Sequence, residues 1–186
     1  MAAINSAPTA LCSQLLKGSG VRVGAAVSFP FGQTTVEAKL FEAKNAIENG
    51  ADDIDYVVNL SELKSGNWKY IEDEIHRMRE LCSANGIVLK VIFENCYLTY
   101  EEKERLCRIA ARVRPDYVKT STGFGPGGAT AEDVKLMCGS SGVKVKAAAR
   151  IRSWQDCLNM LEAGAECIGT RCGVKILEEF DREAKA

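Results

Sequence analysis

Short apolar runs alternate with amphipathic segments along the whole chain. In the amphipathic segments the apolar residues recur every three or four positions, which is typical of helices, whereas the apolar runs have the length of strands. One strand and one helix repeat every roughly 25 to 40 residues, and this predicts a parallel βα array. The predicted strands are Ala2–Asn5, Val21–Phe29, Asp53–Asn59, Ile87–Glu94, Tyr117–Thr122, Val143–Ala149 and Cys167–Thr170.

Capping signals set the predicted limits of several helices. Thr34 and Glu37 form a capping box that opens a helix running to Asn49, and Thr99 with Glu102 repeats the box. Two later helices open at Thr130 and Ser153, and apolar stripes mark two more: Tyr70, Ile71, Ile75, Met78 and Leu81, then Val174, Leu177 and Phe180. Because no linker or charge block interrupts the series, we expect one domain over residues 1–186.

Charged residues stand inside several of the predicted strands. Buried parallel strands normally read as continuous apolar runs. The exceptions here include Asp53, Asp55, Lys90, Glu94, Lys119, Lys144 and Lys146. In a doubly wound flat sheet these charges would be scattered over buried faces. In a TIM (β/α) barrel they converge, and those near the C-terminal strand ends face the catalytic mouth, so the barrel is the predicted fold.

Lys119 is the charge that suggests chemistry. Period-two alternation puts it on one strand face with Tyr117 and Ser121, directly before a glycine-rich turn. An ammonium group is costly to bury, so a strand-built interior favours the neutral amine, which is the nucleophilic form. The alternative is a surface lysine at a strand end. The other charged strands favour the functional interpretation.

Two further residues suit imine chemistry at Lys119. Lys146 lies one strand along and supplies a second positive charge, which disfavours a protonated Lys119. Asp55 can move protons during imine formation and carbon–carbon bond cleavage. No metal or cofactor is expected, because the protonated imine is itself the electron sink. The alternative for Asp55 is an ion pair with Lys90 that only holds the barrel together.

Composition narrows the class of protein. The chain has 24 Lys+Arg against 25 Asp+Glu, a net charge of -1, which predicts no nucleic-acid or anionic-membrane partner. No apolar run reaches about 18 residues, and the first residues lack the pattern of a secretory signal. Eight scattered cysteines without a C-x-x-C pair predict a reduced, intracellular protein. His76, the single histidine, lies in an amphipathic helix pattern and is not expected to bind a metal.

The glycine-rich turn matches a nucleotide-binding pattern by chance. Gly123, Gly125 and Gly128 satisfy G-x-G-x-x-G after a strand. However, Lys144 and Lys146 stand where a dinucleotide site needs an acidic residue about 20 residues further on. A Rossmann site is therefore not expected.

The strand and turn around Lys119 contain a specific motif, Lys-Thr-Ser-Thr-Gly-Phe-Gly at 119–125 in a βα setting. Further segments that belong to the same family pattern lie at 18–23, 29–32, 49–59, 63–66, 89–94, 128–134, 145–147 and 168–170. With these segments, nearly the whole chain resembles the deoxyribose-phosphate aldolases, which are class I aldolases on a TIM barrel.

This resemblance implies the reversible cleavage of 2-deoxy-D-ribose 5-phosphate into acetaldehyde and D-glyceraldehyde 3-phosphate, in deoxynucleoside catabolism in the cytoplasm. It implies that Lys119 forms the Schiff base, that Lys146 is the second active-site lysine and that Asp55 transfers protons. Thr122 and Gly123 would lie beside the imine. The expected ligand is a phosphosugar, and the chain is expected to work without a metal.

Three departures from the family pattern keep alternatives open. Family members begin with an Ile-Asp-His-Thr-like strand and a helix that this chain lacks, which predicts an N-terminally shortened barrel with two unpaired edges. Ala149 and Arg150 stand where the family has glycines that let backbone N–H groups approach the phosphate, and Arg171 replaces a serine. The arginines either bind the phosphate or block it. The alternatives are a catalytically silent fragment, stable as a homo-oligomer, and an imine-forming aldolase for another aldehyde.

Overall fold

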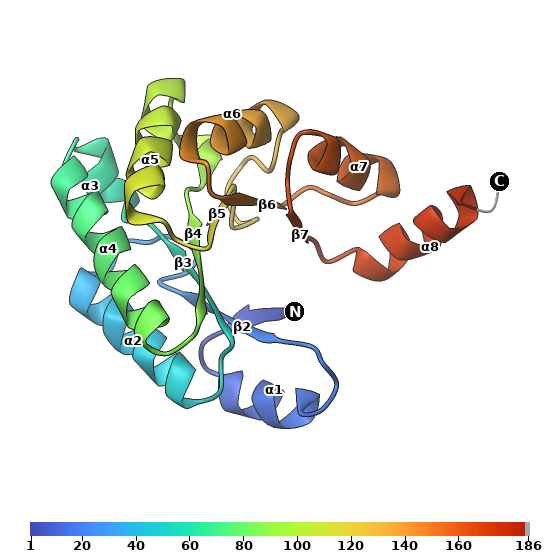
Figure 1. The fold of residues 1–186 in the computed structure, drawn as a ribbon, viewed down its shortest axis with the longest axis horizontal. Coiled ribbons are helices and arrows are strands. Elements are labelled where there is room, and N and C mark those ends of the chain that lie inside the picture. Colours follow the sequence, from blue (N-terminus) through green and yellow to red (C-terminus); the bar gives the residue numbers. More distant parts are fainter. Residues whose placement is uncertain (185–186) are drawn as a thin grey trace. The chain divides into compact units, whose positions relative to one another are not determined.

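In a computed structural model, which describes residues 1–184, seven strands alternate with helices (Figure 1). The strands are β1 (Ala2–Asn5), β2 (Val23–Val27), β3 (Asp53–Val57), β4 (Val88–Ile92), β5 (Tyr117–Lys119), β6 (Lys144–Ala148) and β7 (Cys167–Gly169). The helices are α1 (Thr9–Leu16), α2 (Val36–Glu48), α3 (Leu60–Lys64), α4 (Trp68–Ala84), α5 (Tyr100–Val113), α6 (Ala131–Ser141), α7 (Trp154–Glu162) and α8 (Gly173–Glu183), with a 3-10 turn η1 (Asn95–Tyr97). The strand order β1-β2-β3-β4-β5-β6-β7 follows the chain. All seven predicted strands are present, most of them trimmed at their ends.

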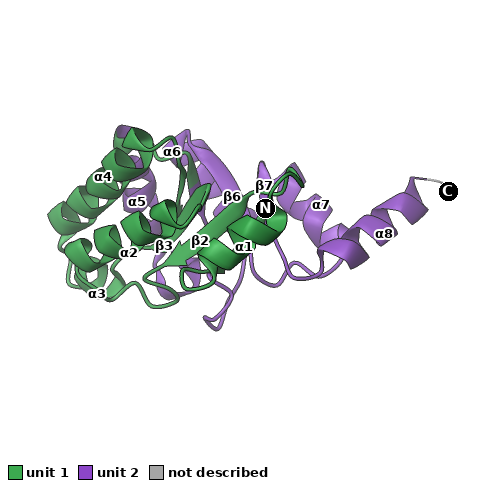
Figure 2. Cartoon of the chain, turned by 90° about the horizontal axis from the view of Figure 1, so that it is seen from below, with its two compact units in different colours: residues 1–92, 113–117 green, residues 93–112, 118–186 purple. Residues whose placement is uncertain are grey.

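The chain folds into two compact units, which Figure 2 shows in green and purple. Unit 1 contains residues 1–92 and 113–117, and unit 2 contains residues 93–112 and 118–186. The expectation that the whole chain is one domain stays a prediction.

In unit 1 the alternation of strand residues separates an apolar row from a charged row. The parallel register aligns Ala25 with Ile54 and Ile54 with Leu89, and all three are fully buried. The neighbouring positions point to the opposite face, so Asp55 pairs with Lys90 in the same register. Helices α2 and α4 lie side by side over unit 1 (Figure 1). The register therefore places Asp55 and Lys90 side by side on one face of the strands, opposite the apolar row.

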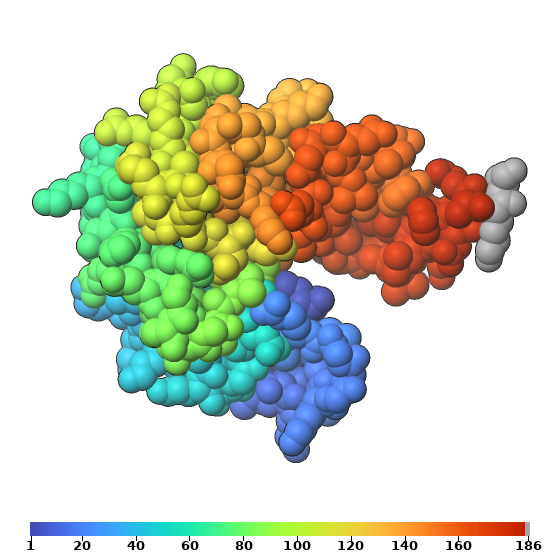
Figure 3. All heavy atoms as spheres, viewed as in Figure 1, coloured from blue at the N-terminus to red at the C-terminus, as the bar shows by residue number. Residues whose placement is uncertain are grey.

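In unit 2 the parallel pair β6 and β7 aligns Lys146 with Cys167 and Ala148 with Gly169. Helix α6 contributes Val134 and Met137 to the buried core. Helix α8 packs on α7, where Trp154 and Phe180 form an edge-to-face pair with ring centroids 4.8 Å apart. Helix α8, drawn in red in Figure 3, exposes one side to solvent. On that helix Val174 is 74% exposed and Leu177 is 64% exposed.

The predicted helix starts are confirmed with one correction. Thr99 with Glu102, Thr130, and Ser153 cap their helices as expected, Ser153 in a reciprocal capping box with Asp156. Helix α2, however, is capped by Thr35, whose hydroxyl accepts from the N–H of Ala38, and not by Thr34. The Thr34 hydroxyl bonds the Ser28 hydroxyl 2.7 Å away, and this contact takes Thr34 away from the cap. Helices α1 and α3 were not predicted from the sequence.

Candidate active site

Lys119 ends strand β5 and is 7% exposed. Its carbonyl accepts from the N–H of Phe93 at 2.9 Å, and the next N–H, of Thr120, donates to the carbonyl of Lys146 at 3.1 Å. The backbone around Lys119 is thus held on both sides by unit 2. A lysine buried to this degree at a C-terminal strand end is uncommon, which makes Lys119 a candidate functional residue.

Lys146 lies in the middle of β6 and is 3% exposed. The Lys146 carbonyl bonds the backbone next to Lys119, so the two lysines belong to neighbouring segments of unit 2. Gly169 on β7 leaves room for the Lys146 side chain, because a Cβ at Gly169 would lie 3.2 Å from Cε of Lys146. The arrangement of two buried lysines agrees with the sequence prediction.

Lys144 differs from that prediction. The sequence grouped it with the inward-pointing charges, but it stands at the start of β6 and its side chain is 57% exposed. Its Nζ lies 3.6 Å from Oε2 of Glu166. Position along the strand decides the outcome, since the first strand residue lies at the surface end and Lys146 lies inside.

Thr122 and Gly123 form the loop after β5. The N–H of Thr122 donates to both carboxylate oxygens of Glu94, at 3.3 and 3.2 Å, and the Thr122 hydroxyl also bonds Glu94. Gly123 has a φ of +94°, which glycine adopts without the steric penalty of a side chain. A Cβ placed on Gly123 would lie 3.6 Å from the methyl of Ala149. Thr122 thus bonds Glu94 and Gly123 lies against Ala149, and both partners are residues of unit 2.

Glu94 is a residue of this site to which the sequence assigned no role. It is 1% exposed, and its backbone is left-handed, with φ 56° and ψ 61°. The sequence signal was present, because Glu94 falls in the charged strand pattern with Lys90. Its role depends on a contact 28 residues away, which the pattern does not show.

Ala149 and Arg150 follow β6 with left-handed backbones, at φ 73° and 62°. The Arg150 guanidinium donates to the carbonyl of Pro126, and the side chain is exposed to solvent. Gly128 is needed opposite them, because a Cβ there would lie 2.7 Å from the Ala149 carbonyl oxygen. Ala149 and Arg150 therefore both adopt the left-handed backbone conformation that glycine normally supplies.

Arg171 is exposed in the loop between β7 and α8. The neighbouring Thr170 ties that loop to the segment after β6, since its hydroxyl donates to the carbonyl of Ile151 at 2.7 Å. The Thr170 hydroxyl also accepts from the N–H of Cys172 at 2.9 Å. The loops that carry Arg150 and Arg171 are thus joined by one hydroxyl.

Asp55 belongs to unit 1, where it lies in β3 and is 2% exposed. Nζ of Lys90 lies 3.2 Å from Oδ1 of Asp55 and also bonds Asp53. Asp53 is in turn 2.9 Å from Nε of Arg22. The ion pair with Lys90, named above as the alternative for Asp55, is therefore present.

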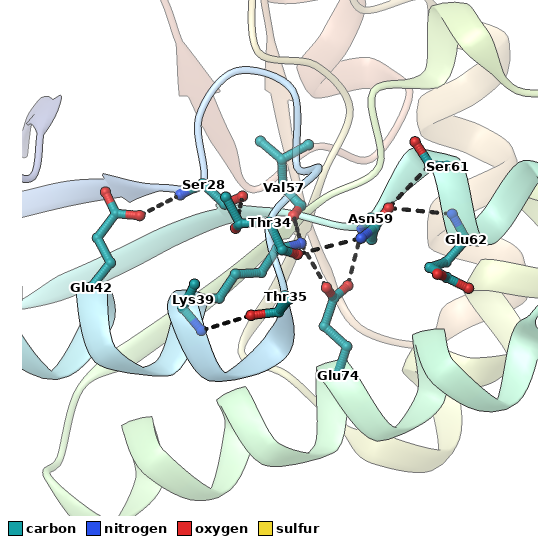
Figure 4. A network of polar contacts seen from close by, with 11 residues as sticks. Ser28, Thr34, Thr35, Lys39, Glu42, Val57, Asn59, Ser61, Glu62 and Glu74 are labelled. Atoms are coloured by element: carbon teal, nitrogen blue, oxygen red, sulfur yellow. Dashed lines mark hydrogen bonds and ion pairs between the residues drawn. The ribbon is translucent and has the colours of Figure 1, made fainter.

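A second buried cluster in unit 1 ties strand ends to helices (Figure 4). Lys39 of α2 donates to Glu74 of α4 at 2.6 Å and to the carbonyl of Val57 at 2.7 Å. Glu74 also accepts from the N–H of Asn59 at 3.1 Å. Burial lowers the pKa of Lys39 and raises the pKa of Glu74, while each charge stabilises the other. The cluster fixes the segment that follows β3.

His76 and the eight cysteines are further residues for which the sequence made predictions. His76 lies on α4 and pairs with Glu80 at 3.3 Å on the surface. Within residues 1–184, no group of three or more His, Cys, Asp or Glu side chains is placed to hold a metal ion. No helix in the same range is long and apolar enough to cross a membrane. The eight cysteines are free thiols, and burial raises the pKa of Cys82 and of Cys107 to about 12.

The comparison with known proteins decides the family. The model of the DeoC/LacD family aldolases matches residues 5–176. The chain belongs to this aldolase family. A deoxyribose-phosphate aldolase of Lactobacillus acidophilus is 51% identical over 180 residues, which cover 96% of this chain and 76% of the relative.

Solved structures of the family share the fold. The aldolase QR15 superposes with a TM-score of 0.89 at 36% identity, over 98% of this chain and 82% of that one. The tetrameric deoxyribose phosphate aldolase of Aeropyrum pernix gives a TM-score of 0.88 at 32% identity, over 96% of this chain and 76% of that one. The TIM (β/α)-barrel fold class predicted from the sequence is confirmed.

Proposed function

We propose that this aldolase reversibly cleaves 2-deoxy-D-ribose 5-phosphate into acetaldehyde and D-glyceraldehyde 3-phosphate. The observation that carries the proposal is a lysine at the end of β5 that is 7% exposed and is followed by Thr120, whose N–H bonds the carbonyl of a second buried lysine. Imine catalysis needs a neutral amine to attack a carbonyl carbon, and burial near a second ammonium group favours the neutral form.

In the proposed reaction the Lys119 amine adds to C1 of the open-chain sugar, and loss of water gives a protonated imine. The C3 hydroxyl then loses its proton and the C2–C3 bond breaks. Its electron pair moves into the imine, so that glyceraldehyde 3-phosphate leaves and an enamine remains. Protonation at C2 and hydrolysis release acetaldehyde and restore the amine. The imine accepts the electron pair of the broken C2–C3 bond, and protonation of the enamine uses this pair again. The reaction therefore needs no oxidant or reductant.

Lys146 and Asp55 take the supporting roles. The Lys146 ammonium disfavours a second positive charge on Lys119 and so keeps the nucleophile neutral. Asp55 carries protons to and from the reacting hydroxyl groups. Its partner Lys90, 3.2 Å away, orients the carboxylate. In this view the ion pair with Lys90 supports the chemistry instead of replacing it.

Thr122 and Gly123 are proposed to contact the substrate beside the imine, and Arg150 and Arg171 to bind its phosphate. Guanidinium groups suit this task, because their planar fork of donors matches phosphate oxygens. Arg150 and Arg171 lie on loops that Thr170 connects through Ile151. The proposed setting is deoxynucleoside breakdown in the cytoplasm, and a homo-oligomer is the proposed assembly, as in the tetrameric relative from Aeropyrum pernix.

Borohydride trapping tests the imine directly. Acetaldehyde and sodium borohydride should leave an N-ethyl group on Lys119, located by peptide mass spectrometry. Lys119→Ala should lose both the label and the cleavage activity. Lys135→Ala, which removes an exposed lysine from α6 of the same unit, is the matched control and should behave as the unchanged protein. Folded protein without a label, or Lys119→Ala with comparable turnover, would overturn the proposal.

Asp55→Asn separates the two roles of Asp55. We expect turnover to fall by about 10²- to 10⁴-fold, the usual contribution of a positioned general acid or base. The unfolding midpoint should change little, since Lys90 keeps its bond to Asp53. Unchanged turnover with a lower midpoint would instead assign Asp55 a structural role.

A second candidate function is an imine-forming aldolase for a different aldehyde. The left-handed Ala149 and Arg150, whose side chains stand where glycines would leave the backbone open, favour it. Comparing phosphorylated with unphosphorylated glyceraldehyde in the synthetic direction distinguishes the two candidates.

A further inference from the structure

Glu94 combines three properties that together suggest a role. It is a carboxylate that is 1% exposed, its side chain bonds Thr122 in the loop after Lys119, and its backbone is left-handed at φ 56°. Glutamate adopts this conformation only when its surroundings enforce it, and such residues gather at functional sites. The role of Glu94 follows from what surrounds it.

The backbone on either side of Glu94 is bonded to the end of β5. The N–H of Phe93 donates to the carbonyl of Lys119 at 2.9 Å, and the N–H of Asn95 donates to the carbonyl of Thr120 at 2.9 Å. These two bonds hold the segment 93–95 alongside the proposed imine lysine. The left-handed turn at Glu94 lies between the two bonds.

The Glu94 carboxylate then holds the next part of the same loop. Both oxygens accept from the N–H of Thr122, and the Thr122 hydroxyl donates to one of them. The Thr122 hydroxyl oxygen also accepts from the N–H of Phe124 at 3.0 Å. A single carboxylate thus fixes Thr122 directly and Phe124 through it. A carboxylate suits two converging donors because it has acceptors only.

The glycines of the turn fit closely against the same segment. A Cβ on Gly125 would lie 2.6 Å from Sγ of Cys96 and 3.4 Å from Cδ of Glu94. A Cβ on Gly127 would lie 2.6 Å from Cβ of Cys96. The glycine-rich turn is therefore packed on the segment from Glu94 to Cys96, which explains why glycine is needed at these two positions.

We infer that Glu94 is a positioning residue of the aldolase, which holds Thr122 and the turn after it against the end of the Lys119 strand. The inference rests on the proposed function, since it assigns the loop to the substrate beside the imine. Glu94 acts through Thr122 and is not assigned contact with the reacting atoms. Its loss should weaken the orientation of the sugar and leave the amine of Lys119 reactive, because the backbone bonds of Lys119 remain.

Glu94→Gln is the main test, because it keeps the shape and replaces one acceptor oxygen by a donor. We expect kcat/KM for cleavage of deoxyribose 5-phosphate to fall by about 10- to 100-fold. The rate of borohydride trapping with acetaldehyde should stay within about threefold, since this two-carbon aldehyde needs only the lysine. Hydrogen exchange in residues 120–126 should become faster in the variant without substrate.

Glu94→Gly and Arg114→Gly form a matched pair. Glycine accepts the left-handed backbone at both positions, φ 56° at Glu94 and φ 58° at Arg114, so both variants should fold. Glu94→Gly should show the same loss of cleavage as Glu94→Gln. Arg114→Gly changes an exposed residue of unit 1 and should keep full activity.

The outcomes distinguish the inference from the proposed function. If the protein without substitutions gains no borohydride label at Lys119, both the proposed function and this inference are overturned. A labelled protein whose Glu94→Gln variant cleaves at the original rate would overturn the inference alone. An equal loss in trapping and cleavage, together with a lower unfolding midpoint, would also overturn it, because that result describes a purely structural residue.

Discussion

The two units hold the C-terminal ends of their strands in different ways. In unit 1 charged side chains of the helices hold these ends: the half-buried Glu42 of α2 accepts from the N–H of Ser28 at 2.8 Å, and the buried pair Lys39 and Glu74 fixes the residues after β3. In unit 2 the corresponding loops hold one another. Glu94 bonds Thr122, and Arg150 bonds the carbonyl of Pro126.

Backbone strain follows this difference. Glu94, Ala149 and Arg150 in unit 2 all have left-handed backbones after strands. Ser28 in unit 1 has one as well, at φ 49°, but its N–H is held by a helix carboxylate. The comparison shows that the loops of unit 1 are bonded to charged side chains of its helices, whereas the loops of unit 2 are bonded to one another.

The largest expected effect tests the buried ion pair of unit 1. Lys39→Met or Glu74→Leu alone should lower the free energy of unfolding by about 3–5 kcal/mol, because each leaves one buried charge without its partner. Both side chains are fully buried, so solvent cannot compensate. The double variant Lys39→Met/Glu74→Leu should regain most of the loss, since apolar residues of similar volume replace a buried pair at little cost. Urea unfolding measures all three.

Two results would break this side of the comparison. Small losses in the single variants would mean that the pair does not support the fold. A double variant no more stable than the single variants would mean that the bonds to Val57 and Asn59, and not the charge pair, carry the stability.

The sequence contained the signal for this pair, but in a form that pattern analysis overlooks. Lys39 lies on the buried stripe of α2 with Val36, Ala43 and Ala46, because these residues are spaced three or four positions apart. Glu74 falls likewise between Ile71 and Ile75 on α4. A charge on an apolar stripe predicts a buried partner, yet the partner stands 35 residues away. Only the packing of α2 on α4 identifies it.

Strands, most caps and the buried lysines were predictable because each depends on local alternation or spacing. Lys119 and Lys146 are buried as expected, and six strands differ from prediction only at their ends. Lys144, the cap at Thr35, and the bond from Glu94 to Thr122 were not predicted. In each case the outcome depends on how deeply a residue is buried or on a contact with another segment. The local sequence pattern shows neither.

An intermediate effect tests the loops of unit 2 that bond one another. Arg150→Gly should raise the KM for deoxyribose 5-phosphate by about tenfold or more, because a hydrogen bond to a charged group contributes roughly 1.5–3 kcal/mol. The KM for unphosphorylated deoxyribose should not change. Lys135→Ala serves again as the control. A lower KM for the phosphorylated sugar in Arg150→Gly would show that the arginine blocks the phosphate, and would favour an aldolase for another aldehyde.

The smallest expected effect compares one helix start from each unit. Helix α2 in unit 1 is capped by the neutral Thr35, and α7 in unit 2 by Ser153 with Asp156. Thr35→Ala and Asp156→Asn should each cost about 1 kcal/mol near pH 7, the usual value of a cap.

The two caps should differ in their response to acid. Hydrogen bonds from the N–H of Arg152 and from Ser153 lower the pKa of Asp156 below its usual 3.8. The stability from a carboxylate with a lowered pKa is present above the unfolded-state pKa and is lost as the pH falls through the folded-state pKa. The gap between the unchanged protein and Asp156→Asn should therefore shrink below about pH 4, while the gap to Thr35→Ala stays constant. Thermal unfolding at pH 7 and near pH 3 measures both, and equal behaviour of the two gaps would mean that the charge of Asp156 contributes nothing to its cap.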